Sequence, residues 1–286
     1  MRNYTERDGV PGLTVLYGVG ALGLLLALVC GIDILIQHRI FIVPEGNITK
    51  PLSFDLSIGL FTLTTAAILP IANFTRRGYQ VFVWTAVLTS LYAYMVETVQ
   101  PFRGLDPRFS HHFRLIDGLA SMGFALDSLI IIVLYIVLMV KFFRTRRLPI
   151  VNLAIRYSMA GIMGAFAAGV WMIVERGRYV GAHGNIIWVH AFGINGIETI
   201  LLFAAMSSSL NGSDFIKGRL VHFQGLLWIL FETLIAVQTA RGDSIFHLTV
   251  ISALAAVLLL LWCGIFLLVF VFWCQRTNRG ASVPQV

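Results

Sequence analysis

One short run of polar residues occurs twice in the chain. The pattern Val-Gln-x-x-Arg-Gly, followed by Asp, occupies residues 99–106 and recurs at residues 237–243. Each copy joins the end of one apolar stretch to the start of the next, and each is followed by a Phe and then a His. An arginine at a helix end can hold a carboxylate or phosphate through two parallel hydrogen bonds. The repetition predicts a duplicated half whose equivalent polar residues meet at one membrane surface.

The glutamines and arginines of the two copies are the first candidate ligand-binding residues: Gln100, Arg103, Gln238 and Arg241. Within each copy the two residues are three apart, so they share a face if the helix continues through them. The Asp that follows, Asp106 or Asp243, could pair with the arginine or cap the next helix. A purely structural turn explains the same pattern, with the arginine reaching the lipid headgroups. Both interpretations stay open.

Histidines gather near the same ends of the apolar stretches, and the candidate ligands among them are His111, His112, His190 and His247. Neutral imidazoles on facing helices are typical ligands of a b-type haem, and the two repeated arginines could hold its propionates. Copper or another metal is an alternative. A lone histidine at a membrane interface often serves only as an amphipathic residue. The pattern favours a redox cofactor, haem b or a quinone/quinol, near the outer surface.

Three acidic residues lie deep within apolar stretches: Asp127, Glu198 and Glu232. A carboxylate at such depth is costly, so each side chain is expected to face other helices. The acids predict a proton relay or a cation site, or else neutral carboxyls that join helices. None of the three aligns with an acid in the other half. Glu97 and Asp33 lie nearer the outer ends and could simply be hydrated.

The composition predicts an all-α integral membrane protein. Hydrophobic residues make up 58% of the 286 residues and charged residues only 12%, about half the charged fraction of a soluble domain. The mean hydropathy is +0.83. A spanning helix needs about 20 apolar residues, and eight runs qualify: 13–36, 56–74, 79–99, 118–143, 153–174, 186–207, 220–240 and 246–274. The three cysteines lack metal-ligand spacing, so neither a disulfide nor a zinc site is expected.

The eight predicted helices divide into two four-helix repeats. We assign residues 1–12 to a cytoplasmic segment, 13–143 to the first repeat, 144–152 to a basic cytoplasmic linker, 153–274 to the second repeat and 275–286 to a disordered cytoplasmic tail. Because four is an even number, both halves enter the membrane in the same sense. The repeats are therefore expected to be parallel, with a pseudo-twofold axis along the membrane normal.

The distribution of positive charge predicts the orientation. With the N-terminus inside, 13 of the 21 Lys and Arg residues lie at the inner side. This agrees with the excess of Lys and Arg that cytoplasmic loops of membrane proteins carry. We expect both termini in the cytoplasm of a prokaryote, with the chain in its cytoplasmic membrane. The repeated motif then faces outward.

Three functions fit these patterns. The favoured one is membrane electron transfer with haem b or a quinol bound at the duplicated Gln/Arg/Asp/His site. The alternative is a proton-coupled transporter or permease for a small anionic solute, in which the buried acids couple protons. A second alternative is a non-catalytic subunit of a larger complex that contacts a membrane or extracytoplasmic protein. Common hydrolase, metalloprotease and phosphate-loop motifs are absent from the sequence, which leaves enzymatic activity undecided. The net charge of +7 reflects membrane orientation, and no nucleic-acid partner is expected.

Overall fold

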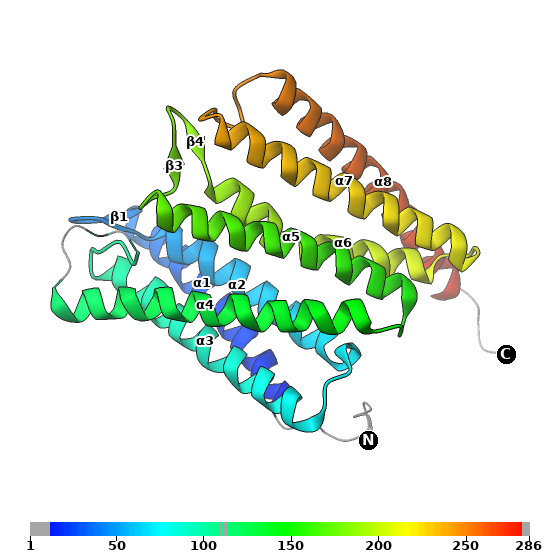
Figure 1. The fold of residues 1–286 in the computed structure, drawn as a ribbon, viewed down its shortest axis with the longest axis horizontal. Coiled ribbons are helices and arrows are strands. Elements are labelled where there is room, and N and C mark those ends of the chain that lie inside the picture. The colour runs from blue at the N-terminus through cyan, green and yellow to red at the C-terminus, as the bar shows by residue number, and fades with distance from the viewer. Residues whose placement is uncertain (1–11, 109, 111–113, 282–286) are drawn as a thin grey trace. The chain divides into compact units, whose positions relative to one another are not determined.

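The chain is a multi-pass integral membrane protein by the length and composition of its helices. The computed structural model describes residues 12–108, 110 and 114–281. This part contains eight helices long and apolar enough to cross a membrane, the number predicted from the sequence. Figure 1 labels them: α1 Leu13–Gln37, α2 Thr49–Ile68, α3 Arg76–Phe102, α4 Leu115–Arg144, α5 Pro149–Val174, α6 Ile187–Ser209, α7 Asp214–Ala240 and α8 Val250–Ala281. A short 3-10 helix, η1, follows α2 over Leu69–Ala72.

Several helices begin or end outside the apolar runs that predict them. Helix α2 begins at Thr49 and α7 at Asp214, where the apolar runs suggest residues 56 and 220. Polar residues at a helix end can stay helical, because their backbone groups still bond within the helix. Ser213 supports the early start of α7, since its hydroxyl accepts from the Ile216 amide over 3.4 Å. Helix α8 starts later than predicted, at Val250, because residues 244–249 form a turn.

The chain divides into two compact units, Met1–Lys141 and Phe142–Val286. In the first unit α1 packs mainly against α2, and α3 contacts both. The boundary falls at the end of α4, close to the basic segment predicted as a linker. Helix α4 ends at Arg144 and α5 begins at Pro149, so the connection between the two helices is only residues 145–148.

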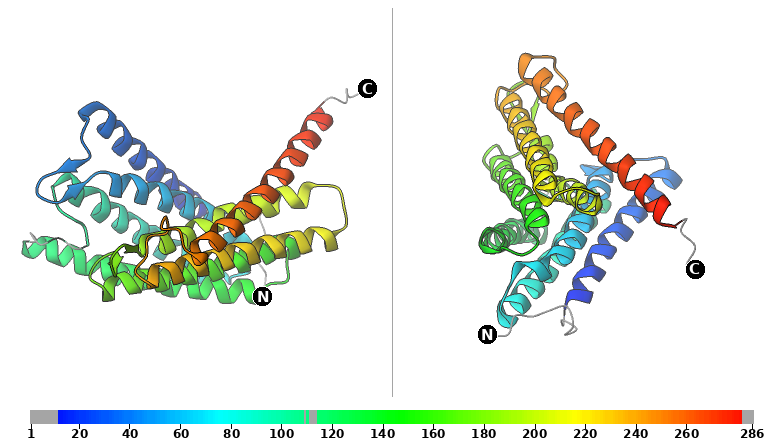
Figure 2. Two further views of the ribbon diagram at one scale, coloured as in Figure 1. Left: turned by 90° about the horizontal axis from the view of Figure 1, so that it is seen from above. Right: turned by 90° about the vertical axis from the view of Figure 1, so that its right-hand side faces the viewer.

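In the second unit, α5, α6 and α7 pack against one another, and α8 lies against α7 and α6. In the left view of Figure 2, α8 leaves α7 at an angle toward its C-terminal end. Small residues bring α5 and α6 together: a Cβ atom added to Gly193 would lie 2.5 Å from the backbone oxygen of Gly161 and 2.7 Å from the Ala165 Cβ. Only glycines permit so close an approach of two helix backbones.

Each unit also contains a β-hairpin that the sequence did not predict. Strands β1 (Phe41–Ile42) and β2 (Gly46–Asn47) pair in the first unit, and β3 (Tyr179–Val180) and β4 (Gly184–Asn185) pair in the second. Each hairpin is hydrogen-bonded to the turn that the repeated motif forms. The Glu45 amide donates to the Gly104 oxygen, and the His183 amide donates to the Gly242 oxygen, both over 2.8 Å.

Replacing Gly184 by alanine is expected to destabilise the second unit. The added Cβ would lie 2.5 Å from the Thr239 backbone oxygen and 2.7 Å from that of Val180, so the hairpin would have to move away from the turn. Such overpacking costs about 1–3 kcal/mol. Denaturant unfolding in detergent measures the loss. The control is Gly218→Ala, where a Cβ meets nothing within 4 Å and the helix should gain stability. Equal stability of the two variants would contradict this packing.

Candidate functional site

The first copy of the repeated motif forms the turn after α3. Arg103 donates to the Asp117 carboxylate over 2.5 Å and to the Gln100 side-chain oxygen over 2.9 Å. The Gln100 amide donates to the same Asp117 oxygen over 3.3 Å. Asp117 lies in the first turn of α4 and is buried. The three side chains thus join the end of α3 to the start of α4, and the charge of Arg103 is neutralised within the protein.

Two further ion pairs lie around this turn. Lys50 pairs with Asp106, and the Arg108 Nε atom donates to Glu97 Oε1 over 2.5 Å. Hydration of Glu97, suggested by its place near the helix end, is wrong: its side chain is only 1% exposed. The segment after the turn returns across the helix end and covers this carboxylate with Arg108.

Arg108 stabilises the buried Glu97 carboxylate. Its guanidinium carbon also lies 5.6 Å from the centre of the Phe54 ring and 5.5 Å from that of Phe124, within the range of cation–π attraction. Burial opposes the positive charge, but the Glu97 carboxylate outweighs this effect, so the pKa of Arg108 is raised above its ordinary value. Within the described segments, Glu97 Oε2 has no hydrogen-bond partner. The neutralisation of Glu97 therefore depends on Arg108.

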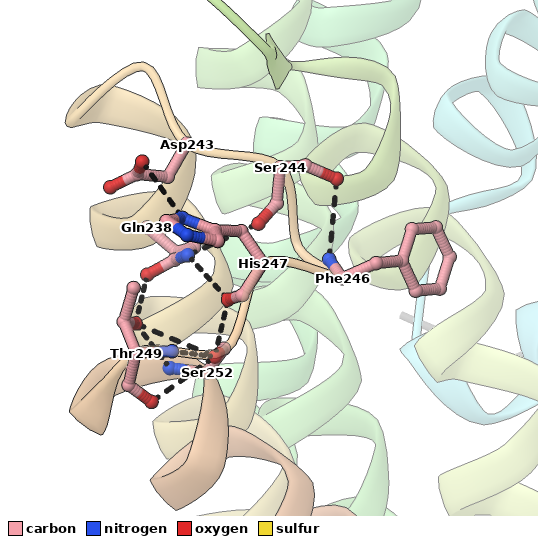
Figure 3. Close-up of polar contacts among 7 residues, drawn as sticks. All are labelled: Gln238, Asp243, Ser244, Phe246, His247, Thr249 and Ser252. Carbon is pink, nitrogen blue, oxygen red and sulfur yellow. Dashed lines mark hydrogen bonds and ion pairs between the residues drawn. The ribbon is translucent and has the colours of Figure 1, made fainter.

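The second copy of the motif forms the turn between α7 and α8 (Figure 3). The Gln238 amide donates to the backbone oxygens of Ser244 and His247 over 3.1 and 3.2 Å, and its oxygen accepts from the Thr249 hydroxyl over 2.7 Å. The Ser252 hydroxyl donates to the His247 oxygen over 2.8 Å. Gln238 is fully buried, so its amide satisfies carbonyl groups of the turn that leads into α8.

Replacing Gln238 by alanine is expected to loosen this turn. The variant leaves the carbonyls of Ser244 and His247 without this buried donor, at a cost of about 1–3 kcal/mol. Amide hydrogen exchange of residues 241–249 should become faster, while exchange within α7 stays slow. The exposed Gln37 gives a matched control, because its side chain makes no hydrogen bond to another described residue. Unchanged exchange in 241–249 would mean that Gln238 does not hold the turn.

The charged side chains of the second copy are more exposed to solvent than those of the first. His247 Nδ1 lies 3.3 Å from Asp243 Oδ1, and the His247 side chain is 65% exposed. Arg241 is exposed as well. The Arg241 side chain makes no hydrogen bond or ion pair with another described residue. Arg241 can therefore meet an anion from solution, whereas Arg103 is held by Asp117.

The two copies share their backbone geometry at a constant offset of 138 residues. Gly104 and Gly242 have φ values of 79° and 80°, a region that glycine adopts without steric cost. In both copies the amide five residues after the Gln donates to the carbonyl of that Gln, over 2.9 and 3.3 Å. The Arg-Gly pair recurs because both turns need the same backbone conformation.

The candidate haem ligands are only partly described. His111 and His112 lie outside the described residues. His190 Nδ1 lies 2.7 Å from the Ala165 backbone oxygen, across the contact between α6 and α5. His247 lies in the turn before α8. Among the residues the structure describes, no group of three or more His, Cys, Asp or Glu side chains could hold a metal ion.

Glu232 lies where α5, α6 and α7 meet. Cβ atoms added to Gly164 and Gly193 would lie 2.6 and 2.5 Å from Glu232 Oε1, and one added to Gly161 would lie 3.0 Å from Oε2. The carboxyl group therefore fills the space that three glycines leave. It is 5% exposed, and neither oxygen has a hydrogen-bond partner in the described part of the chain. A carboxyl so placed is far less costly with a proton or a bound cation than as a bare carboxylate.

Other ionisable residues of these three helices make contacts of their own. Arg156 donates to three backbone carbonyls at the end of α4 and in the α4–α5 connection. His190 contacts a backbone carbonyl of α5, and His222 contacts the Tyr157 hydroxyl over 2.7 Å. None of these contacts supplies a positive charge to the α7 carboxyl.

The other two predicted acids also lie within helices, and those of their carboxyl oxygens that have no described partner are buried. Asp127, on α4, is 6% exposed, and its Oδ2 atom has no partner among the described side chains and backbone. Both Glu198 oxygens are likewise buried and unpartnered within that part. The neighbours expected to share the Glu198 face bond to their own helix instead: Asn195 donates to the Ala191 oxygen and Thr199 to the Asn195 oxygen. These acids lie on separate helices from Glu232.

The sequence interpretation missed a further buried acid, Asp55. Its side chain is 0% exposed. Oδ2 accepts from the Thr98 hydroxyl over 2.9 Å, and Oδ1 has no partner among the residues described. Asp55 immediately precedes the apolar run at 56–74, so the sequence pattern places it outside the predicted helix. The signal that could have found it is Pro51, which fits the first turn of a helix and marks the early start of α2.

Comparison of the chain with protein-family models, with curated proteins and with solved structures found no match. The helices and side chains described above therefore carry the functional proposal. They present two features that can act chemically: an exposed arginine at one end of the second unit, and unpaired carboxyls inside both units.

Proposed function

We propose that the chain is a proton-coupled transporter for a small anionic solute in a prokaryotic cytoplasmic membrane. Two parallel four-helix repeats, with both termini in the cytoplasm, form its pathway. In this arrangement the repeated turns face the outside and Glu232 lies in the membrane interior. The motif at the surface attracts the anion, and the buried carboxyl carries the proton.

The observation that carries the proposal is the environment of Glu232. Its carboxyl lies among glycines of two other helices and has no described partner. A carboxyl that merely joins helices would donate or accept a hydrogen bond across the contact. Acids inside the membrane often belong to proton relays.

The anionic character of the solute is inferred from Arg241. This guanidinium is exposed at the turn after α7 and is not paired with a described acid. Arginine binds carboxylates and phosphates through two parallel hydrogen bonds. Arg103 is engaged by Asp117, so the second unit supports anion capture better than the first.

The test is anion-driven proton movement in liposomes. The purified full chain is reconstituted with a pH-sensitive dye in the lumen, and succinate, citrate, phosphate or sulfate is added outside. We expect at least one of these anions to acidify the lumen faster than in protein-free liposomes. Absence of acidification with all four anions, together with haem absorption bands in the purified protein, would replace this proposal with the redox one.

Electron transfer is the second candidate, and His190 is the observation that favours it. With Nδ1 donating to the Ala165 carbonyl, the ring has the orientation in which Nε2 usually binds a metal. A dithionite-reduced absorption spectrum tests this function. Bands of a low-spin b haem that disappear in His190→Ala, but persist in His183→Ala, would support it, and a featureless spectrum would count against haem.

A further inference from the structure

The site around Glu232 has a counterpart in the first unit that carries its acid on a different helix. Gly161 of α5 faces the Glu232 carboxyl, and 138 residues earlier Gly23 of α1 faces Tyr94 of α3. A Cβ atom added to Gly23 would lie 2.3 Å from the Tyr94 hydroxyl oxygen. Tyr94 and Glu232 are also 138 residues apart. In both units, therefore, a glycine of the first helix contacts the end of a polar side chain, which comes from α3 in the first unit and from the equivalent position of α7 in the second.

A third position completes the equivalence. The same added Cβ on Gly23 would lie 2.9 Å from the Asp55 backbone oxygen, and on Gly161 it would lie 3.6 Å from the Gly193 backbone oxygen. Asp55 and Gly193 are again 138 residues apart. The first unit thus combines Asp on α2 with Tyr on α3, while the second combines Gly on α6 with Glu on α7. Each unit thus has one acidic residue among these three equivalent positions.

Among the residues that the structure describes, no cation neutralises the Asp55 carboxyl. Thr98 donates to one of its oxygens, and the other has no partner within the described residues. Three ionisable groups interact electrostatically with Asp55: Glu97, Tyr94 and Cys30. None is positively charged, and Glu97 already engages Arg108. A fully buried carboxylate in such surroundings is costly, whereas the neutral acid is tolerated.

We propose that Asp55 is a second proton-binding carboxyl, the counterpart in the first unit of Glu232, so that each unit binds one proton at an equivalent three-helix contact. The inference rests on the proposed proton-coupled function and extends it from one proton site to two. Asp127 and Glu198 lack this relation, because neither is among the groups nearest to a Cβ atom added at Gly23 or Gly161. The two-unit pattern therefore singles out Asp55 and Glu232 among the buried acids.

Infrared spectroscopy of the full chain in liposomes tests the proposal without knowledge of the solute. A protonated carboxyl has a C=O band separate from those of carboxylates and amides. At neutral pH, subtraction of the Asp55→Asn spectrum from that of the wild type should leave this band, and so should subtraction of Glu232→Gln. Subtraction of Glu97→Gln should not, because that carboxylate is paired with Arg108.

The outcomes separate this inference from the function on which it rests. A band for Glu232 without one for Asp55 overturns the second site and leaves the proposed function standing. A band for Asp55 without one for Glu232 contradicts the proposed role of Glu232 and the equivalence. Absence of both bands overturns both proposals.

A transplant of the acid tests the equivalence itself. Asp55→Gly combined with Tyr94→Glu gives the first unit the arrangement of the second. The protonated-carboxyl band, lost in Asp55→Gly, should return in the double variant. In the liposome assay, Asp55→Asn should lower the anion-driven proton flux by at least about twofold. A folded double variant without the band, or an unchanged flux in Asp55→Asn, overturns the proposal; if the double variant does not fold, the infrared comparison of the single variants decides.

Discussion

Replacing Glu232 by Gln should reduce the anion-driven proton flux into liposomes by at least about tenfold. Gln nearly preserves the size and shape of the side chain, so the contact with the glycines of α5 and α6 is retained. It cannot bind and release a proton in the relevant range, and so the coupling step is lost. Binding of the anion at the outer surface should persist, because Arg241 lies in the turn after α7 and not at this contact.

Glu175→Gln is the matched control for this substitution. Glu175 follows α5 in the same unit, is exposed and contacts Trp171 of its own turn. The chemical change is identical, but the flux should stay within about twofold of the wild type. Equal loss of flux in both variants would point to a general effect of charge. Full activity of Glu232→Gln would exclude Glu232 as the proton carrier.

Replacing Arg108 by Ala should lower the free energy of unfolding by about 3 kcal/mol. The variant leaves the Glu97 carboxylate buried, 1% exposed, without the guanidinium that neutralises it. The contacts with the rings of Phe54 and Phe124 are lost as well. Equilibrium unfolding in detergent, followed by tryptophan fluorescence, measures the change.

A double-mutant cycle separates the ion pair from packing. Adding Glu97→Gln to Arg108→Ala should restore part of the lost stability, because no unpaired carboxylate is then buried. Arg241→Ala, which removes an exposed arginine from the equivalent turn, should change stability by no more than about 0.5 kcal/mol. Additive effects of the two substitutions at Glu97 and Arg108 would mean that the pair is not coupled.

The number of spanning helices followed from the sequence, because long apolar runs have few alternatives in a chain of this composition. Their ends did not follow, since helices such as α2 and α7 continue through polar residues whose backbone bonds stay within the helix. This error hid Asp55, which is the seventh residue of α2 and not part of a loop. The hairpins were not predicted either, because strands of two residues are too short to show an alternation of apolar and polar residues.

The repeated motif could be found from the sequence, but the contacts of its residues could not. Arg103 and Arg241 are equivalent by position, yet one pairs with Asp117 and the other is exposed. The difference arises because Asp117 has no acidic counterpart at position 255, which is Ala. The relation of Asp55 to Glu232 was equally hidden, because the acids occupy non-equivalent positions on helices that converge at equivalent glycines.

The most direct test of proton coupling is accumulation of a labelled anion against its concentration gradient. Wild-type liposomes with an alkaline lumen are placed in an acidic medium that contains the anion selected in the acidification assay. Coupled transport predicts that the anion accumulates inside above its outside concentration and that a protonophore abolishes the accumulation. Simple equilibration of the anion, unaffected by the pH gradient or by the protonophore, would contradict proton coupling and with it the assigned role of Glu232.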